Sequence, residues 1–430
     1  MRIAIIGGGL TGLTAAYALA GKHSVVVFEK DKDLGGMAGS YIVDWDGKKW
    51  SISKTYHHIL NGDETTKNMI KSLGLDSKLH WKKVKQGFIY NDKIYGFSTL
   101  TEILKFPLPL ADKIRLAKFV LFGTKKKDWS VLEGVNAKDW IIKEAGQRNF
   151  DVFFDQLIRN KFHEPAENIS ASWVGTRFVK ESSSFLKSFG WLEGGISQIV
   201  YGLAEGIKNR GGKIFTDTKV ISIKNEKQKK LIYEKNGLKK QLIFDVIVST
   251  VAPEVILNLV DKLPEDVERQ LRKIRYLSCI CMTAGLKKEF TDRYWMNVLD
   301  KDKPFSAVFN HTALYEDAAP AGKSVFFVAT YLMRDEPLWK KSDEEIKNIY
   351  VEALNKILPG FKYNIEWWRI FKIEYAEAIY RTGFINPPMF TDGLYFAGIY
   401  RIYPKIRNMS SAMEEGLAVA AKIEENVKNV

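Results

Sequence analysis

The residues with the clearest chemical potential are three glycines near the start of the chain. Gly7, Gly9 and Gly12 follow an apolar run from Ile3 to Ile6 and open an Ala- and Leu-rich segment. A second apolar run then ends at Glu29, 20 residues after Gly9. This order is typical of a dinucleotide-binding βαβ unit, which consists of a strand, a glycine turn, a helix and a second strand that ends at an acidic residue. A glycine turn without a ligand is the plainer alternative, and the complete context argues against it.

Each residue of this unit has a predicted task. Gly7 makes the tight turn, Gly9 lets the backbone approach a pyrophosphate, and Gly12 lets the helix pack closely. The first residues of that helix, Leu10 and Thr11, offer unpaired backbone N–H groups and a partial positive charge to phosphates. The carboxylate of Glu29 can accept hydrogen bonds from ribose hydroxyls.

Two further features favour FAD over NAD. The first is a second glycine pair, Gly35-Gly36, whose bare backbone suits the ribityl and pyrophosphate of a long, extended cofactor. The second is an apolar strand, Leu394 to Gly398, followed by a helix that can aim its N-terminus at a flavin ring.

At these residues the chain resembles the flavin-containing amine oxidase superfamily. It is most similar to the protoporphyrinogen-oxidase-like branch, whose relatives include UDP-galactopyranose mutases and phytoene-type desaturases. The matching pieces span the whole chain in family order: Gly7 to Gly12, Glu29 to Ser40, Trp191 to Gly195, Asp245 to Pro253, Tyr375 to Tyr380, and Gly393 to Ala421.

The resemblance implies an α/β fold: a Rossmann-like FAD-binding domain of the glutathione-reductase or amine-oxidase type, with a discontinuous α+β substrate domain. The FAD-binding domain would take residues 1–60, 190–255 and 385–430. The substrate domain would take residues 61–189, which are mostly helical by period from Thr99 to Phe189, and the strand-rich residues 256–384.

The resemblance also implies further cofactor contacts. Gly35 to Ser40 would line the ribityl chain, Val220 would meet the adenine through its backbone, and Thr250 would lie nearby. Gly398 and the turn from Met409 to Met413 would approach the flavin. The complete predicted set is Gly7, Gly9, Leu10, Thr11, Gly12, Glu29, Lys30, Gly35, Gly36, Met37, Ala38, Gly39, Ser40, Val220, Thr250, Gly398, Ile399, Met409 and Met413.

Two positions depart from the family pattern. Amine oxidases usually follow the second glycine pair with Arg, and here the residue is Met37. Many members follow the final glycine with Asp, and here it is Ile399. FAD binding tolerates both changes, because backbone N–H groups carry much of it, but both weaken an interpretation as a true amine oxidase.

Catalytic candidates are few, because a flavin itself supplies the difficult chemistry. His57 and His58 lie where mutases of UDP-galactopyranose carry a histidine beside the flavin, and only one of two adjacent strand residues can face the ring. Tyr400, Arg401 and Tyr403 resemble the tyrosine-rich segment of those mutases and could contact a phosphorylated substrate. His311 is a weaker pocket candidate. No metal site is predicted, since the histidines lack metal-ligand spacing.

The composition limits which partners and which cellular compartment are expected for the protein. The net charge is +14, yet no helix-turn-helix, zinc-finger or RNA-binding signature supports a nucleic-acid partner. The early first strand leaves no room for a signal peptide, and Cys279 and Cys281 are expected to be buried thiols in a reducing cytoplasm. Residues Leu110 to Phe122 predict a helix that either belongs to the core, which is favoured, or lies on a membrane. The oligomeric state stays open.

Three functions follow, in order of preference. The first is an FAD oxidoreductase that transfers hydride from a C–H bond of an apolar or cyclic small molecule to flavin N5. The second is a non-redox mutase that uses reduced flavin on a nucleotide sugar. The third is a flavin-binding module without activity.

Overall fold

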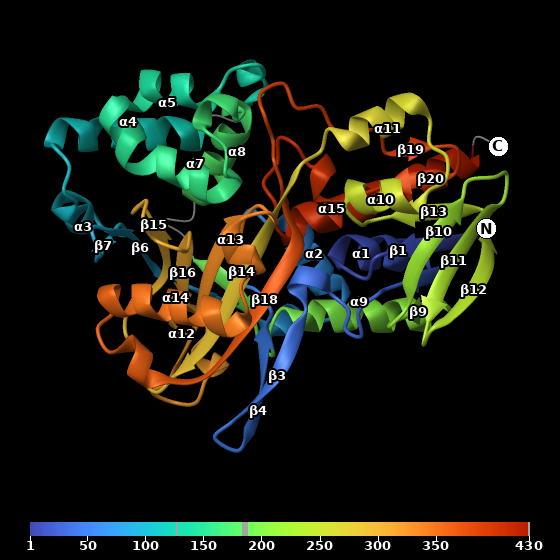
Figure 1. Ribbon diagram of the computed structural model, residues 1–430, viewed down its shortest axis with the longest axis horizontal. Helices are drawn as coiled ribbons and strands as arrows, with labels where there is room; N and C mark the ends of the chain where they lie inside the picture. The colour runs from blue at the N-terminus through green and yellow to red at the C-terminus, as the bar shows by residue number, and fades with distance from the viewer. Residues whose placement is uncertain (126–127, 183–187, 429–430) are drawn as a thin grey trace.

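The computed structural model describes residues 1–125, 128–182 and 188–428. Figure 1 shows three parts: a sheet with flanking helices that holds both termini, a second large sheet, and a group of helices above the second sheet. The Rossmann-like sheet and the separate mixed sheet confirm the predicted fold class.

The first sheet has the strand order β19-β20-β13-β1-β2-β9. All its pairings are parallel except that of the short edge strand β19. Parallel strands end at one edge of a sheet, so the loops after β1, β2, β13 and β20 meet there. The bounds are β1 (Arg2–Ile6), β2 (Ser24–Phe28), β9 (Lys213–Phe215), β13 (Val246–Ser249), β19 (Phe390–Thr391) and β20 (Leu394–Phe396).

Alternating side chains of this sheet bury two different layers. Ile3 and Ile5 pack with the helices, whereas Ala4 and Ile6 belong to the core on the opposite face. The helical layer contains α1 (Leu10–Leu19), α2 (Glu64–Ser72), α9 (Ser197–Asn209) and α15 (Met409–Lys428). The opposite layer contains a small sheet of β10 (Lys219–Lys224), β11 (Lys229–Lys235) and β12 (Leu238–Phe244), with α10 (Pro253–Leu259) and α11 (Glu265–Arg272).

The second sheet has the order β18-β14-β17-β16-β15-β6-β7 and is antiparallel except between β15 and β6. One face of the sheet packs on α14, where Met282 of the sheet and Leu354 of the helix share one core. The other face presents Cys281 and Tyr331 to the main core. The bounds are β6 (Lys85–Tyr90), β7 (Lys93–Gly96), β14 (Tyr276–Leu286), β15 (Arg293–Val298), β16 (Ala307–Asn310), β17 (Ser324–Leu332), β18 (Ile365–Ala378) and α14 (Asp343–Ile357).

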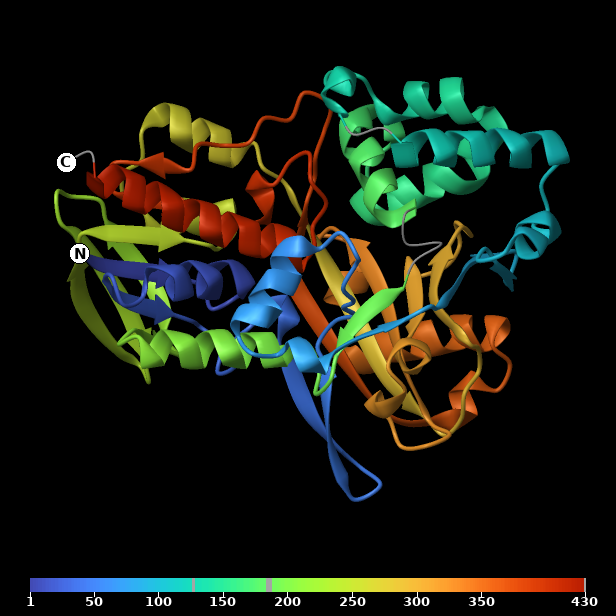
Figure 2. The same cartoon turned by 180° about the vertical axis from the view of Figure 1, so that it is seen from behind.

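The predicted stretch from Thr99 to Phe189 is mostly helical over its described residues, and Phe189 itself belongs to a strand; residues 126–127 and 183–187 lie outside the described ranges. Figure 2 shows these helices from behind, still gathered over one end of the second sheet. The bounds are α3 (Leu100–Lys105), α4 (Leu110–Lys125), α5 (Ala137–Ala145), α6 (Gln147–Asn149), a π-helical turn (Phe150–Phe154), α7 (Asp155–Phe162) and α8 (Ala171–Ser182).

The remaining elements are short. A hairpin that turns at Asp46-Gly47 is formed by β3 and β4, and β5 pairs with β8. The bounds are β3 (Ser40–Trp45), β4 (Lys48–Ser53), β5 (Leu79–Lys82), β8 (Phe189–Leu192), α12 (His311–Leu314) and α13 (Pro337–Lys340).

The predicted domain boundaries stay a proposal. All six strands of the first sheet come from residues 1–60, 190–255 and 385–430, as proposed. Helix α2, from the other side of the boundary at residue 60, also packs on this unit, because Met69 and Ile70 share the core of α1 and α9.

Helix α4 contains the residues predicted either as a core helix or as a membrane-surface helix. Leu116 and Phe119 are buried, whereas Leu110, Ile114 and Leu121 are exposed. Membrane contact therefore stays a prediction. Among the described residues, no helix is long and apolar enough to cross a membrane.

Candidate functional site

The first glycine turn has the geometry that its spacing predicts. Gly7 has a φ of 107°, a conformation that side chains with a Cβ atom rarely adopt. A Cβ atom on Gly12 would lie 2.0 Å from the carbonyl oxygen of Gly7, so only glycine lets α1 begin this close to β1. A Cβ atom on Gly9 would meet open space, which leaves room for a ligand beside the backbone.

The second glycine pair lies directly against the first turn. The N–H of Gly35 donates to the carbonyl of Gly8 at 2.8 Å, and Gly36 approaches Gly9. Met37, Ala38 and Gly39 continue from this contact to Ser40 at the start of β3. The segment Gly35 to Ser40 thus extends the surface that Gly7 to Gly12 begin, as predicted for an elongated cofactor.

Glu29 is buried at the end of β2 and supports the first turn. Its carboxylate accepts the N–H of Gly8 at 2.7 Å and the N–H of Asp31 at 2.9 Å. Each carboxylate oxygen can accept a further hydrogen bond, so a contact with a ribose stays a prediction. The side chain of Lys30 is exposed and pairs with Asp31.

The predicted cofactor contacts that follow β13 and β20 converge on the same edge of the sheet. Thr250 follows β13, and its hydroxyl donates to the carbonyl of Ile6 at 2.8 Å. Gly398 follows β20 with a φ of 149°, and the carbonyl of Thr250 would lie 3.7 Å from a Cβ atom there. Ile399 opens a 3₁₀ turn next to Gly398.

The other predicted contacts have structural surroundings of their own. Met409 and Met413 are buried at the start of α15, in the core shared with Leu10 and Leu13. Val220 is buried in β10 and paired with Tyr233. Their cofactor contacts stay predictions.

This arrangement fits FAD. Gly9 precedes helix α1 as its N-cap residue and provides no side-chain cap, so the first N–H groups of the helix remain available to an anion. The open space at Gly9 and the adjoining second glycine pair offer a continuous bare backbone for a pyrophosphate and ribityl chain. When bound, FAD supplies hydride-accepting chemistry, which the chain's own side chains lack.

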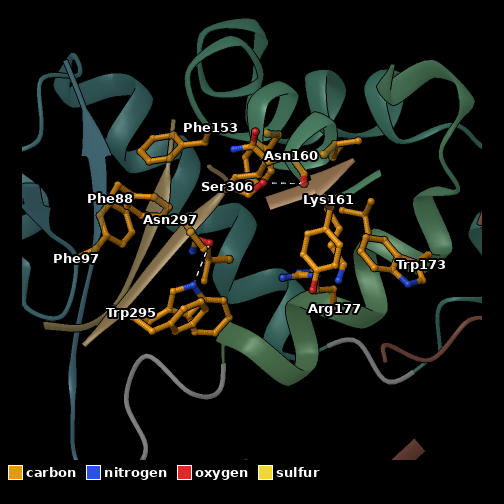
Figure 3. A pocket seen from close by; sticks show the side chains of 18 of the residues that line it. Phe88, Phe97, Phe153, Asn160, Lys161, Trp173, Arg177, Trp295, Asn297 and Ser306 are labelled. Atoms are coloured by element: carbon orange, nitrogen blue, oxygen red, sulfur yellow. Dashed lines mark hydrogen bonds between the residues drawn. The ribbon is translucent and has the colours of Figure 1, made fainter. Parts of the chain in front are cut away.

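An apolar cavity of about 180 Å³ lies between the helical group and the second sheet. In Figure 3, Phe88, Phe97 and Phe153 lie on one side, and Lys161, Trp173 and Arg177 lie on the other. The polar lining is largely occupied, since Asn297 accepts from Trp295 and Ser306 donates to the carbonyl of Asn160. Such a cavity suits a ligand with a large apolar body.

A buried cluster of three charged side chains, Glu377, Lys161 and Arg407, adjoins this cavity and is called the charge cluster. Glu377 on β18 accepts hydrogen bonds from Lys161 on α7 and, at 2.9 Å, from Arg407. The carboxylate is fully buried, whereas the Lys161 side chain is 15% exposed and lines the cavity. Burial opposes ionisation of Glu377, but Lys161 and Arg407 outweigh it and hold the pKa of Glu377 below its usual range.

The cluster connects the cavity to the second glycine pair. Arg407 contacts the sulfur of Met37 at 3.2 Å and donates to the hydroxyl of Tyr331. The Tyr331 hydroxyl lies 3.0 Å from that of Tyr56, and both tyrosines line the cavity. The cavity and the second glycine pair are therefore joined by one chain of polar contacts.

Sequence reasoning missed Lys161, Glu377, Arg407 and Tyr331. The sequence contained a signal for two of these residues. Lys161 stands four residues after Leu157 on an otherwise apolar helix face, and Glu377 stands between two alanines in a strand. A charge within an apolar pattern indicates a buried ion pair or a functional site.

The predicted histidines lie near the cavity without lining it. His57 contacts the carbonyl of Thr55 at 3.0 Å, and His58 contacts the hydroxyl of Tyr294 at 2.9 Å. The side chain of His311 lies against Phe327. Burial lowers the pKa of His57 to about 4, of His58 to about 3 and of His311 to about 4. All three are neutral at pH 7, and a catalytic role for His57 or His58 stays a prediction.

These depressed pKa values predict that mild acid destabilises the fold. Below pH 6.5 the unfolded chain binds protons that the folded histidines do not, so the free energy of unfolding falls as the pH falls. For His58 the loss between pH 7 and pH 5 is about 2 kcal/mol. Urea unfolding at both pH values measures it. Between pH 7 and pH 5, the His58→Asn variant is expected to lose less stability than the wild type. The variant His80→Asn, at an exposed site, is expected to lose as much stability as the wild type. Equal losses in all three proteins would contradict the assignment.

Of the predicted contacts to a phosphorylated substrate, Arg401 and Tyr403 form polar contacts within the protein, whereas the hydroxyl of Tyr400 has no hydrogen-bond partner among the described residues. Tyr400 is fully buried. Arg401 lies 3.3 Å from Glu415 and also donates to the carbonyl of Pro387. The hydroxyl of Tyr403 lies 2.8 Å from that of Ser170. None of the three lines the cavity, and their role in binding a phosphorylated substrate stays a prediction.

No group of metal-ligating side chains exists within the described ranges, and Cys279 and Cys281 are both buried and free. The predicted burial of the thiols is confirmed.

Comparison with known proteins agrees with this geometry. Residues 10–424 match the model of the flavin-containing amine oxidoreductase family. Zeta-carotene desaturase from Synechocystis sp. is 24% identical, and the match covers 98% of this chain and 97% of the desaturase.

Solved structures of low sequence identity share the fold, and two of them serve as examples. A protein from Exiguobacterium sp. 255-15, described as a "Putative protoporphyrinogen oxidase", has a TM-score of 0.77 at 16% identity, with 99% of each chain covered. A reduced UDP-galactopyranose mutase has a TM-score of 0.75 at 15% identity, with 99% of this chain and 95% of the mutase covered. The match over almost the whole length, together with the paired glycine turns, shows that this chain belongs to the flavin-containing amine oxidoreductase family and is an FAD-dependent oxidoreductase.

Proposed function

We propose that the protein oxidises an apolar or cyclic small molecule held in the aromatic cavity, with hydride passing from a substrate C–H bond to N5 of the flavin. The observation that carries this proposal is the position of the cavity. Its lining residue Tyr331 is joined through Arg407 to Met37, beside the second glycine pair.

The cavity residues have two tasks in this reaction. Phe88, Phe97, Phe153 and Trp173 pack against the apolar body of the substrate and exclude water. The stacked pair of Tyr56 and Phe309, with ring centroids 3.9 Å apart, forms a rigid wall. Burial raises the pKa of Tyr56 to about 12, so its hydroxyl stays protonated in the physiological range.

The mutase alternative has less support from the site. A nucleotide sugar is polar along most of its length, and Arg401, the residue predicted to contact its phosphates, is held by Glu415 and does not line the cavity. The lining of the cavity is mostly aromatic and aliphatic. These features favour net oxidation over rearrangement.

The mass of the product separates the two reactions. The purified holoenzyme is mixed with cyclic and polyene compounds and with a nucleotide sugar, as oxidised enzyme without air, in air, and after reduction with dithionite. Oxidation is expected to bleach the flavin without air and to give a product that lacks two hydrogens. A product of unchanged mass, formed only by the reduced enzyme, would refute oxidation and establish the mutase alternative.

A further inference from the structure

The charge cluster at the inner side of the cavity contains more positive than negative charge. Lys161 and Arg407 carry two positive charges, and Glu377 supplies one negative charge between them. Among the described residues, no aspartate or glutamate lines the cavity. Arg177 also lines it, but the excess exists without counting this residue.

Lys161 has hydrogen-bonding capacity that the folded chain leaves unused. A lysine ammonium has three donors, and within the described ranges only Glu377 accepts from it. Its Nζ atom lies 4.4 Å from the ring centroid of Tyr331. The unused donors are thus located where the side chain lines the cavity.

An excess charge in an apolar cavity needs a partner from outside the chain. A cation with little water around it costs free energy unless an anion pairs with it. An amine ligand would add a further positive charge. Glu377, the carboxylate of the cluster among the described residues, is fully buried, does not line the cavity and already pairs with Lys161 and Arg407. The cavity is therefore suited to anions and unsuited to amines.

We propose that the substrate of this cavity has an apolar ring or chain as its body and an anionic end group, a carboxylate or a phosphate, that pairs with Lys161. The inference rests on the proposed function, since it names the substrate class for the same cavity. The aromatic lining binds the body, and the ammonium of Lys161 fixes its orientation relative to Met37.

The proposal predicts a dependence of binding on pH. Burial lowers the pKa of Lys161 to about 8, against the opposing effect of Glu377. The charged or titratable groups that face Lys161 are Glu377, Arg407, Arg177, Tyr331 and Cys279. Because deprotonation removes the charge that attracts the anion, binding is expected to weaken as the pH rises through 8 and above.

Four probes with the same ring system test the charge preference. These are 2-naphthoate, neutral 2-naphthamide and cationic 2-naphthylmethylamine, with 2-naphthyl phosphate to distinguish a phosphate from a carboxylate. Binding to the holoenzyme is measured by calorimetry and by perturbation of the flavin absorbance. Because a hydrogen bond between charged partners is stronger than one to a neutral group, one of the two anions is expected to bind at least about tenfold more tightly than the amide.

Variants assign the preference to one residue. Lys161→Met is expected to lose the preference for anions and keep its affinity for the amide, and Lys161→Arg to keep the preference. Lys138→Met removes a lysine that pairs with Glu167 outside the cavity, and it is expected to bind like the wild type. Amine binding equal to anion binding in the wild type would overturn the proposal, whatever happens to the variants.

The outcome is separate from that of the proposed function. An enzyme that oxidises a neutral compound and ignores both anions would sustain the function and refute the anionic substrate. If Lys161→Met lowered the flavin potential and left the affinity for the anions unchanged, the excess charge would serve the reduced flavin instead, and the proposal would fail.

Discussion

The Gly12→Ala variant is expected to lose FAD and a substantial part of its stability. The new Cβ atom would lie 2.0 Å from the carbonyl oxygen of Gly7 and 3.1 Å from the hydroxyl of Thr250. The first of these neighbours is backbone, so it cannot move without displacing the turn that receives the pyrophosphate. Overpacking of this kind costs about 1–3 kcal/mol of folding free energy. A similar loss of binding free energy weakens FAD affinity by about 100-fold.

Flavin content and thermal unfolding of the purified variant measure these two losses. Gly62→Ala is the matched control, because a Cβ atom at Gly62 would meet open space. That variant is expected to keep its flavin and its stability. Normal flavin content in Gly12→Ala would contradict the close packing of α1 against the first turn.

The Glu377→Gln variant is expected to be destabilised by about 3–5 kcal/mol, the cost of leaving buried charges without a partner. Its carboxylate is fully buried and holds Lys161 and Arg407 together. Glutamine keeps the size of the side chain, so the loss reports the missing charge rather than a cavity. Denaturant unfolding at pH 7 gives the free energy of unfolding.

An exposed glutamate provides the comparison. Glu352 lies 3.6 Å from Lys362 with a side chain that is 67% exposed, so Glu352→Gln is expected to change stability by less than about 1 kcal/mol. The double variant Lys161→Met/Glu377→Gln is expected to lose less than the sum of its single variants, because it removes two charges that compensate each other. Equal stability of the two glutamine variants would contradict a buried, charged Glu377.

The first turn could be predicted from the sequence because its physics is local. Gly7, Gly9 and Gly12 lie within six residues, and each has a task fixed by backbone geometry. The position of Glu29 could also be predicted, because one helix and one strand of ordinary length separate it from the glycine turn. The alternation of Ile3 to Ile6 likewise determines which residues face the helices.

The charge cluster could not be predicted in this way because its members are far apart in the chain. Lys161 and Glu377 are separated by 216 residues, and Arg407 joins them from a third segment. Only the packing of α7 against the second sheet brings them together. The sequence directed attention to His57 and His58 instead, whereas their neighbour Tyr56 is the residue that lines the cavity.

The measurement that tests the central claim most directly is the absorbance spectrum of the purified protein, recorded as isolated, after dithionite and after return to air. The paired glycine turns predict oxidised flavin bands that bleach with dithionite and recover in air, and they predict that Gly12→Ala lacks these bands. A wild-type protein that stays colourless, even after refolding with added FAD, would contradict the account and make NAD binding the better interpretation of the turn.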